Sequence, residues 1–211
     1  MSNIPDEMDI YFFDLQGYLL LEQALTPDEV AACNDRLDEL LPMESDEWDG
    51  YLHARPISKG ADTFQLQQIY EAGGPFESLI DHPSWIDKVK YFVGGEGTFD
   101  WLHGPLFIEE NFAWVRGPGM ATFMHSGGHE NAKRTQFQCL NGRFQCGQVN
   151  ILIALTNMGP GDGTTMVIPG SHKSNFAHPQ AANPIDGKRP AALDGIRAVS
   201  YTHLRAHETS E

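Results

Sequence analysis

A short segment near the middle of the chain combines side chains that bind metal ions. His125 follows the apolar stretch Ala121 to Met124, and His129 and Glu130 come soon after it. Imidazole and carboxylate groups form the common non-haem Fe(II) site, in which two His and one carboxylate leave positions open for oxygen and a co-substrate. The segment predicts an Fe(II) site for which His125, His129 and Glu130 are the candidate ligands. The competing interpretation is a surface histidine that only makes hydrogen bonds.

The residues around His125 favour a ligand at the end of a strand over a ligand on a helix. Gly127 and Gly128 let a bound molecule approach the backbone closely. The zinc-binding helix motif H-E-x-x-H does not match, because the order of residues differs and Ser126-Gly127-Gly128 would break a helix. A rigid strand that ends at His125 would hold its ring in place for a metal.

Two polar side chains on a later predicted strand could bind a co-substrate. Gln148 and Asn150 alternate with Val149 and Ile151, and alternate residues of a strand face opposite sides. If the polar set faces a barrel interior, Gln148 and Asn150 could bind the carboxylate of a co-substrate. The competing interpretation is an exposed polar strand face.

Other histidines have weaker claims to a chemical role. His172 lies in Pro169-Gly170-Ser171-His172-Lys173, where Pro and Gly indicate a turn that defines shape. His203 and His207 fall in a stretch from about Ala198 that resembles the in-frame translation of a sequencing adapter. We therefore expect a non-native tail over 198–211 and a natural sequence cut near Arg197.

The N-terminal part predicts a strand and two helices. Gly17 to Leu21 is a short apolar run typical of a buried strand. Thr26-Pro27-Asp28-Glu29 predicts a helix start with a capping box. The helix would bury the face formed by Val30, Cys33, Leu37, Leu40 and Leu41. A second helix is predicted from about His82 to Val93, where glycines follow.

After residue 97 the pattern changes to short apolar segments separated by turns. The segments are 105–115, 120–124, 148–155 and 164–168, with Asn141-Gly142 among the turns. We expect a mainly β fold with flanking N-terminal helices, the helical part at about 1–96 and the β part at about 97–197. A jelly roll needs about eight strands, so this one would be incomplete within the single domain 1–197.

Composition excludes several classes of function. The net charge of −15 argues against nucleic acid and anionic membranes as partners. Three cysteines without C-x-x-C spacing indicate reduced thiols in a cytoplasmic protein. The acidic start lacks the features of a signal peptide, and no apolar run reaches the length of a membrane span.

Three segments together resemble the phytanoyl-CoA dioxygenase family. They are Gly147 to Leu155, Pro160-Gly161-Asp162-Gly163, and Val167 to Phe176, and the resemblance covers Tyr11 to Phe176. It implies a double-stranded β-helix (jelly roll, cupin-like) that holds Fe(II) and uses 2-oxoglutarate as co-substrate. Such an enzyme would oxidise 2-oxoglutarate to succinate and carbon dioxide and hydroxylate a small organic substrate.

The resemblance leaves two gaps in the implied site. The family motif His-x-Asp/Glu places His125 as the first ligand, but Gly127 stands at the carboxylate position. Glu130 could supply the carboxylate if the loop bulges back, while His129 with Asn131 is a poorer register. A site without the carboxylate is similar to the related halogenases. The distal His and the 2-oxoglutarate-binding Arg of the family have no match before Arg197, so we expect this fragment to be inactive.

Two alternatives to the dioxygenase remain open. Gly127 favours a non-catalytic β-barrel that binds small molecules and has lost the iron site. A zinc or iron cupin-like isomerase using His125, His129 and Glu130 would require the final residues to be native.

Overall fold

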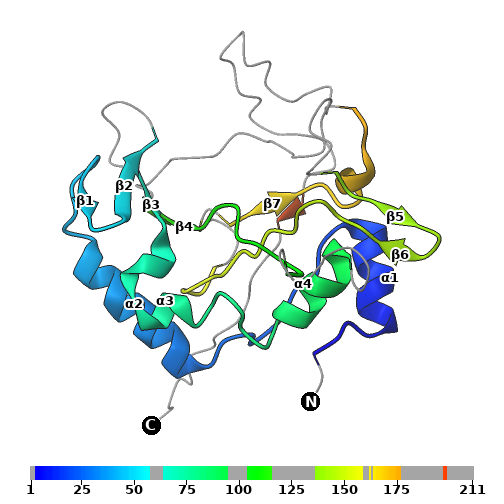
Figure 1. The fold of residues 1–211 in the computed structure, drawn as a ribbon, viewed down its shortest axis with the longest axis horizontal. Coiled ribbons are helices and arrows are strands. Elements are labelled where there is room, and N and C mark those ends of the chain that lie inside the picture. Colours follow the sequence, from blue (N-terminus) through cyan, green and yellow to red (C-terminus); the bar gives the residue numbers. More distant parts are fainter. Residues whose placement is uncertain are drawn as a thin grey trace. The chain divides into compact units, whose positions relative to one another are not determined.

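The computed structural model describes residues 3–57, 64–94, 104–115, 136–158, 162, 164–176 and 197–198 (Figure 1). The chain divides into two compact units. The first unit comprises Met1–Gln23, Trp85–Leu106 and Thr122–Glu211, and the second comprises Ala24–Ser84 and Phe107–Ala121. Each unit is described by itself below. Among the described residues, no helix combines the length and apolar character that crossing a bilayer requires.

The second unit begins with the predicted capped helix. Helix α2 (Pro27–Leu40) has Thr26 as N-cap and a complete capping box with Glu29. The Thr26 hydroxyl accepts from the Glu29 N–H at 3.3 Å, and the Glu29 carboxylate accepts from the Thr26 N–H at 2.7 Å. Val30, Cys33 and Leu40 are buried as predicted. Leu41 is exposed instead, because the helix ends at Leu40.

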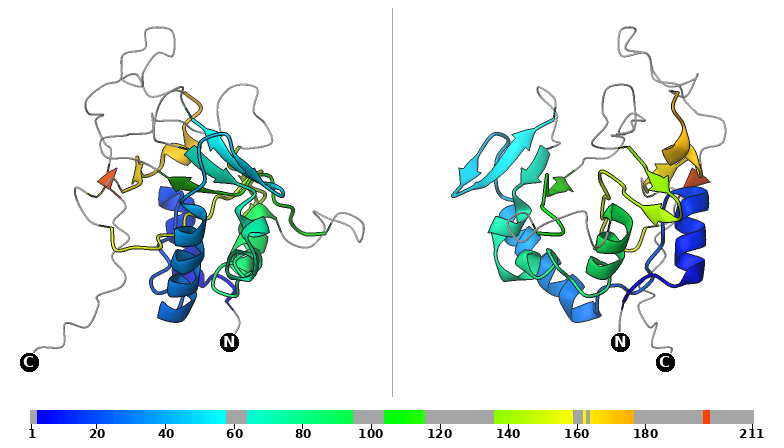
Figure 2. Two further views of the ribbon diagram at one scale, coloured as in Figure 1. Left: turned by 90° about the vertical axis from the view of Figure 1, so that its left-hand side faces the viewer. Right: turned by 45° about the vertical axis from the view of Figure 1, so that its right-hand side comes forward.

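A four-stranded antiparallel sheet forms the rest of the second unit, with strand order β1-β2-β3-β4 (Figure 2). The strands are β1 (Trp48–Asp49), β2 (Leu52–Pro56), β3 (Phe64–Gln67) and β4 (Phe112–Val115), followed after β3 by the short helices η1 (Ile69–Ala72) and α3 (Gly74–Glu77). The predicted helical part, 1–96, thus contains three of the four strands. Leu52, Ala54 and Leu66 are almost completely buried in this sheet.

Two α-helices of the first unit, among the residues described, pack around an aromatic core. They are α1 (Glu7–Gln16) and α4 (Ile86–Val93). Helix α4 confirms the second predicted helix, whereas α1 was not predicted. Asp6 and Asp9 form a capping box at the start of α1, and Gly17 ends it with a φ of 84°. The strand predicted at 17–21 is wrong, because Gly17 is the C-cap of a helix and no ladder follows.

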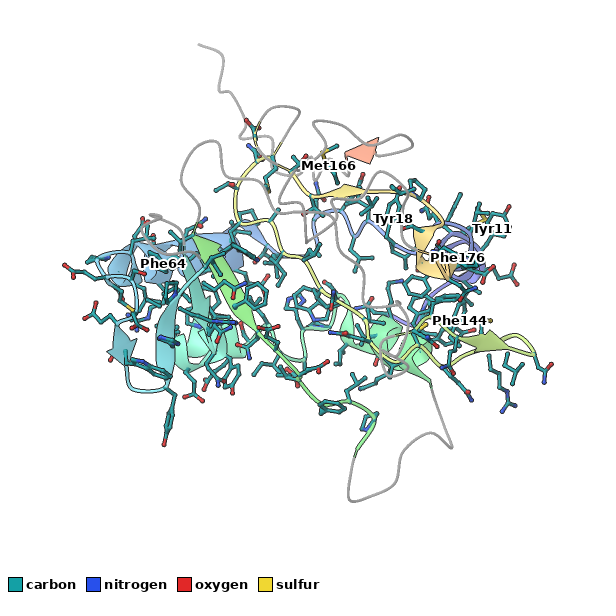
Figure 3. All side chains as sticks on the ribbon, turned by 90° about the horizontal axis from the view of Figure 1, so that it is seen from above. Tyr11, Tyr18, Phe64, Phe144, Met166 and Phe176 are labelled. Carbon is teal, nitrogen blue, oxygen red and sulfur yellow. The ribbon has the colours of Figure 1, made fainter. Side chains whose placement is uncertain are left out.

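The core of the first unit is built from Phe92, Phe144 and Cys146 (Phe144 is labelled in Figure 3). Ile10 and Phe13 of α1 pack against this cluster. The rings of Phe13 and Phe92 stack with centroids 3.8 Å apart. Lys88 of α4 also pairs with Asp9 of α1.

The β segments of the first unit are short. Strands β5 (Cys139–Leu140) and β6 (Arg143–Phe144) form a hairpin, and β7 (Met166–Val167) pairs with β8 (Arg197–Ala198). The predicted turn at Asn141-Gly142 is confirmed, with φ values of 51° and 74°. Two positive φ values are typical of the type I′ hairpin turn. All strand pairs are antiparallel, while the complete double-stranded β-helix stays a prediction.

Candidate functional site

The predicted iron ligands lie outside the described residues. His125, His129 and Glu130 belong to the stretch 116–135, so their arrangement as ligands stays a prediction. In the part of the chain that the structure describes, no group of three or more His, Cys, Asp or Glu side chains could hold a metal. The chemistry of the donor set still suits Fe(II), because it combines imidazole with carboxylate.

The predicted co-substrate residues follow β6 in the first unit. Val149 packs against the aromatic core of the first unit, and the side chains on either side of it, Gln148 and Asn150, are exposed. The segment 148–155 is not part of a strand ladder among the described residues. Ile151, Leu152 and Ile153 are also exposed, by 41%, 55% and 37%. Co-substrate binding by Gln148 and Asn150 remains a prediction.

The Pro-Gly-Ser-His-Lys turn is attached to the end of helix α1. Gly170 has a φ of 83°, and η3 (Ser171–Lys173) follows it. The Gly170 N–H donates to the Gln16 carbonyl at 2.9 Å, and the Lys173 ammonium lies 2.9 Å from the Asp14 carboxylate. The last carbonyls of a helix lack partners within it. The Gly170 N–H satisfies the carbonyl of Gln16, and Lys173 places a cation beside this end of α1. The turn therefore fixes the end of α1.

His172 makes a third contact with the end of α1. Its Nε2 lies 3.0 Å from the Asp14 carbonyl oxygen, which can only accept, so Nε2 carries the proton and donates. The ring meets Phe137 edge-on, with centroids 4.5 Å apart. Nδ1 is buried without a hydrogen-bond partner in the described part of the chain. Burial lowers the pKa of His172, against the opposing effect of the hydrogen bond to Asp14. These contacts agree with a structural role for the turn.

A groove of about 580 Å³ lies beside this turn. Its lining combines polar and apolar groups in similar measure; the residues are Asp14, Gln136, Phe137, Gln138, Cys139, Leu140, Gln145, His172, Lys173, Ser174 and Asn175. Asp14 and Lys173, the two oppositely charged residues, pair with each other. The groove thus offers hydrogen-bonding groups with balanced charge, which is not the chemistry of a metal centre.

One polar network in the second unit was not predicted. His82, which has no evident partner in the sequence, lies with its Nε2 3.1 Å from Glu29 Oε1. The Ser84 N–H donates to His82 Nδ1 at 3.3 Å, and the Ser84 hydroxyl donates to the Ala24 carbonyl at 2.6 Å. Glu29 has its pKa lowered to about 2, first by the Thr26 backbone N–H, then by the Thr26 hydroxyl and His82. The network joins the helix cap to the 82–84 segment.

Comparison with known proteins gives one family and two relatives. Residues 13–198 match the family model of phytanoyl-CoA dioxygenase (PhyH). The chain is similar to the ectoine dioxygenase of Streptomyces coelicolor, at 25% identity over 167 residues, 79% of this chain and 50% of that protein. It is also similar to the dioxygenase cdmD of Talaromyces verruculosus, at 38% identity over 63 residues, 30% of this chain and 20% of that protein. The chain thus spans half or less of the length of these relatives. No solved structure matches it significantly.

Proposed function

The chain belongs to the phytanoyl-CoA dioxygenase family, and we propose that its full-length protein is an Fe(II)- and 2-oxoglutarate-dependent dioxygenase that hydroxylates a small organic substrate. The family match over residues 13–198 carries this proposal. The two relatives that are named as dioxygenases support it. The double-stranded β-helix is proposed on the same ground.

The residues proposed to hold the iron are His125 and Glu130, with His129 as the alternative. The donor set of imidazole and carboxylate is the one that open non-haem Fe(II) sites use. When bound, the iron would supply the oxidation of 2-oxoglutarate and substrate by oxygen. The protein would hold the ligands in place and leave coordination positions free.

Gln148 and Asn150 are proposed to hold the co-substrate. Each carries an amide NH₂ that can donate to a carboxylate oxygen. Both side chains are exposed among the described residues, so they are accessible to a bound acid. Val149 between them is anchored in the aromatic core of the first unit, which would fix the segment that carries both amides.

The test is turnover of 2-oxoglutarate by the full-length gene product. Succinate formation should require Fe(II) and oxygen, and His125→Ala should abolish it. His53→Ala is the matched control, because His53 is not among the proposed ligands and its Nε2 lies 3.1 Å from Asp46 Oδ1. Comparing Glu130→Gln with His129→Ala identifies the further ligand. Full turnover by His125→Ala would remove this residue from the site.

A binding protein without iron is the second candidate. Gly127 favours it, because it stands where the family motif has a carboxylate. Such a protein would bind a small organic molecule without succinate formation under any condition. Quenching of tryptophan fluorescence by Fe(II), lost in His125→Ala, would count against it.

A further inference from the structure

The ring of His172 is held from several sides within the first unit. Its Nε2 donates to the Asp14 carbonyl at 3.0 Å, and its Nδ1 lies beside Gly17, where an added Cβ would come within 2.2 Å. The ring also meets Phe137 edge-on, with centroids 4.5 Å apart and planes at 87°. A ring that is fixed by a hydrogen bond and by packing holds its neighbour in a defined place. The end of α1 therefore fixes the position of Phe137 through His172.

Phe137 connects the 170–173 turn to the hairpin formed by β5 and β6. Lys173 of the same turn places its ammonium 5.5 Å from the centre of the Phe137 ring, in a cation–π arrangement. Phe137 also packs against the aromatic core of the first unit, with the ring of Phe144 at a centroid distance of 6.0 Å. Phe137 is thus in contact with the turn and with the core.

The strand that carries Phe137 also holds the backbone next to Gln148. The carbonyl of Gln136, which precedes Phe137, accepts from the Gly147 N–H at 3.1 Å. Val149 packs against the same core cluster as Phe137. The residues on either side of Gln148 are therefore held by contacts that include this strand and this core.

We propose that His172 is a positioning residue for Gln148 and Asn150. This inference rests on the proposed function, in which the two amides hold the carboxylate of 2-oxoglutarate. His172 acts indirectly: it fixes Phe137, the strand and core around Phe137 fix the backbone on either side of Gln148, and this backbone directs both amides. Groups that bind a ligand need such support, because a displacement of about 1 Å is enough to weaken their function.

Calorimetric titration of the Fe(II)-loaded full-length protein with 2-oxoglutarate, without oxygen, tests the proposal. His172→Ala should raise the dissociation constant about fivefold, an effect typical of coupled residues in contact, while kcat at saturating 2-oxoglutarate stays unchanged. His172→Gln keeps an N–H for the Asp14 carbonyl but lacks the ring, so it should bind as weakly as His172→Ala. Wild-type affinity in His172→Gln would overturn the proposal, because that variant restores a turn that only fastens α1.

Phe137→Leu tests whether Phe137 transmits the effect. It should weaken binding as His172→Ala does, and the double variant should bind no more weakly than either single variant, because both changes break the same contact. His82→Ala is the matched control, since His82 is a buried histidine of the second unit with its Nε2 3.1 Å from Glu29. It should lower stability and leave the dissociation constant unchanged. Additive effects of the first two variants, or an equal loss in His82→Ala, would overturn the proposal.

Hydrogen exchange of the Gly147 amide gives a readout that needs no ligand. His172→Ala should speed exchange of peptides that contain Gly147 about fivefold by easing local opening, and His82→Ala should not. Unchanged exchange in His172→Ala would overturn the positioning role even where the wild type binds 2-oxoglutarate. A wild type that binds no 2-oxoglutarate would instead overturn the proposed co-substrate site, and with it the role of His172 in binding.

Discussion

The ring of His172 fills the space directly next to the Cα of Gly17. A Cβ atom built on Gly17 would lie 2.2 Å from His172 Nδ1, and the φ of Gly17 is +84°. Glycine is therefore required here twice, once by the backbone conformation and once by the histidine ring. Together with the hydrogen bonds of His172 to Asp14 and of Gly170 to Gln16, this contact fixes the end of α1 to the Ser171–Lys173 turn.

Gly17→Ala should destabilise the protein by roughly 1–3 kcal/mol, the range for a strained φ, with the steric conflict against His172 adding to it. Gly142→Ala is the matched control, because Gly142 has a φ of +74° and nothing within 4 Å of an added Cβ. Denaturant unfolding measures both. Adding His172→Ala should relieve the steric part of the Gly17→Ala effect only. Equal destabilisation by Gly17→Ala and Gly142→Ala would show that the histidine contact does not matter.

His172 should make the first unit less stable in acid. The pKa of His172 in the folded protein is lowered from 6.5, mainly by burial. Between the folded pKa and 6.5, the unfolded chain therefore binds a proton that the folded protein does not. The stability that comes from the neutral, buried His172 ring is complete above about pH 6.5 and falls as the pH decreases towards the folded pKa. Asp14 and Lys173 are the charged groups that face the ring, and they act in opposite directions.

The free energy of unfolding is measured at about pH 7.5 and about pH 5.5, on either side of the ordinary histidine pKa. His172→Gln keeps an N–H for the Asp14 carbonyl but cannot titrate, so its stability should change less between these pH values. A change as large as that of the wild type would assign the acid sensitivity to other groups.

Glu29 should stabilise helix α2 down to strongly acidic pH. Its pKa is lowered to about 2 by hydrogen bonds to the Thr26 N–H and hydroxyl and to His82. The contribution of a depressed carboxylate is present above its unfolded pKa and is lost as pH falls through the folded value. The difference in unfolding free energy between the wild type and Glu29→Gln should therefore shrink as the pH falls from about 5 to about 2, because the Glu29 carboxylate becomes protonated over this range. Asp28→Asn, which removes another carboxylate from the same helical turn, is the matched control. Thr26→Ala should lower the free energy of unfolding by about 1 kcal/mol, because it removes the N-cap of α2.

Phe92 should be the most sensitive of the described aromatic positions of the first unit. It is only 2% exposed and stacks on Phe13. Phe92→Ala should lower the free energy of unfolding by about 3–5 kcal/mol, since it removes a buried ring and leaves a cavity. Phe176→Ala is the control, because Phe176 is 87% exposed, and should change stability by less than about 0.5 kcal/mol. Similar losses from the two variants would contradict the assigned core.

Local signals in the sequence predicted some elements closely. Thr26 to Glu29 specified the start of α2, and Asn141-Gly142 specified the hairpin turn, because caps and type I′ turns depend on a few neighbouring residues. Helix α1 was missed because its apolar residues surround the helix and several of them, such as Met8 and Tyr11, are exposed. Strand β3 was missed because Gln65 is buried between Phe64 and Leu66, which removes the alternation that identifies a strand.

The contacts of the candidate sites depend on residues far apart in the chain, and only part of them could be predicted. The turn at His172 was identified from Pro169 and Gly170, but its attachment to Asp14 spans 158 residues. His82 and Glu29 are 53 residues apart, so neither suggests the other in the sequence, although Glu29 was predicted as a cap. The proposed ligands His125 and Glu130 depend on local spacing and family resemblance.

Anaerobic binding of Fe(II) and 2-oxoglutarate to the full-length protein, followed by visible absorption, is the decisive test of the proposed iron site at His125. If the account is right, a charge-transfer band appears only when both are present, and His125→Ala abolishes it while His53→Ala does not. Admitting oxygen should then remove the band and release succinate. Absence of the band from a folded wild-type protein, or an unchanged band in His125→Ala, would contradict the account.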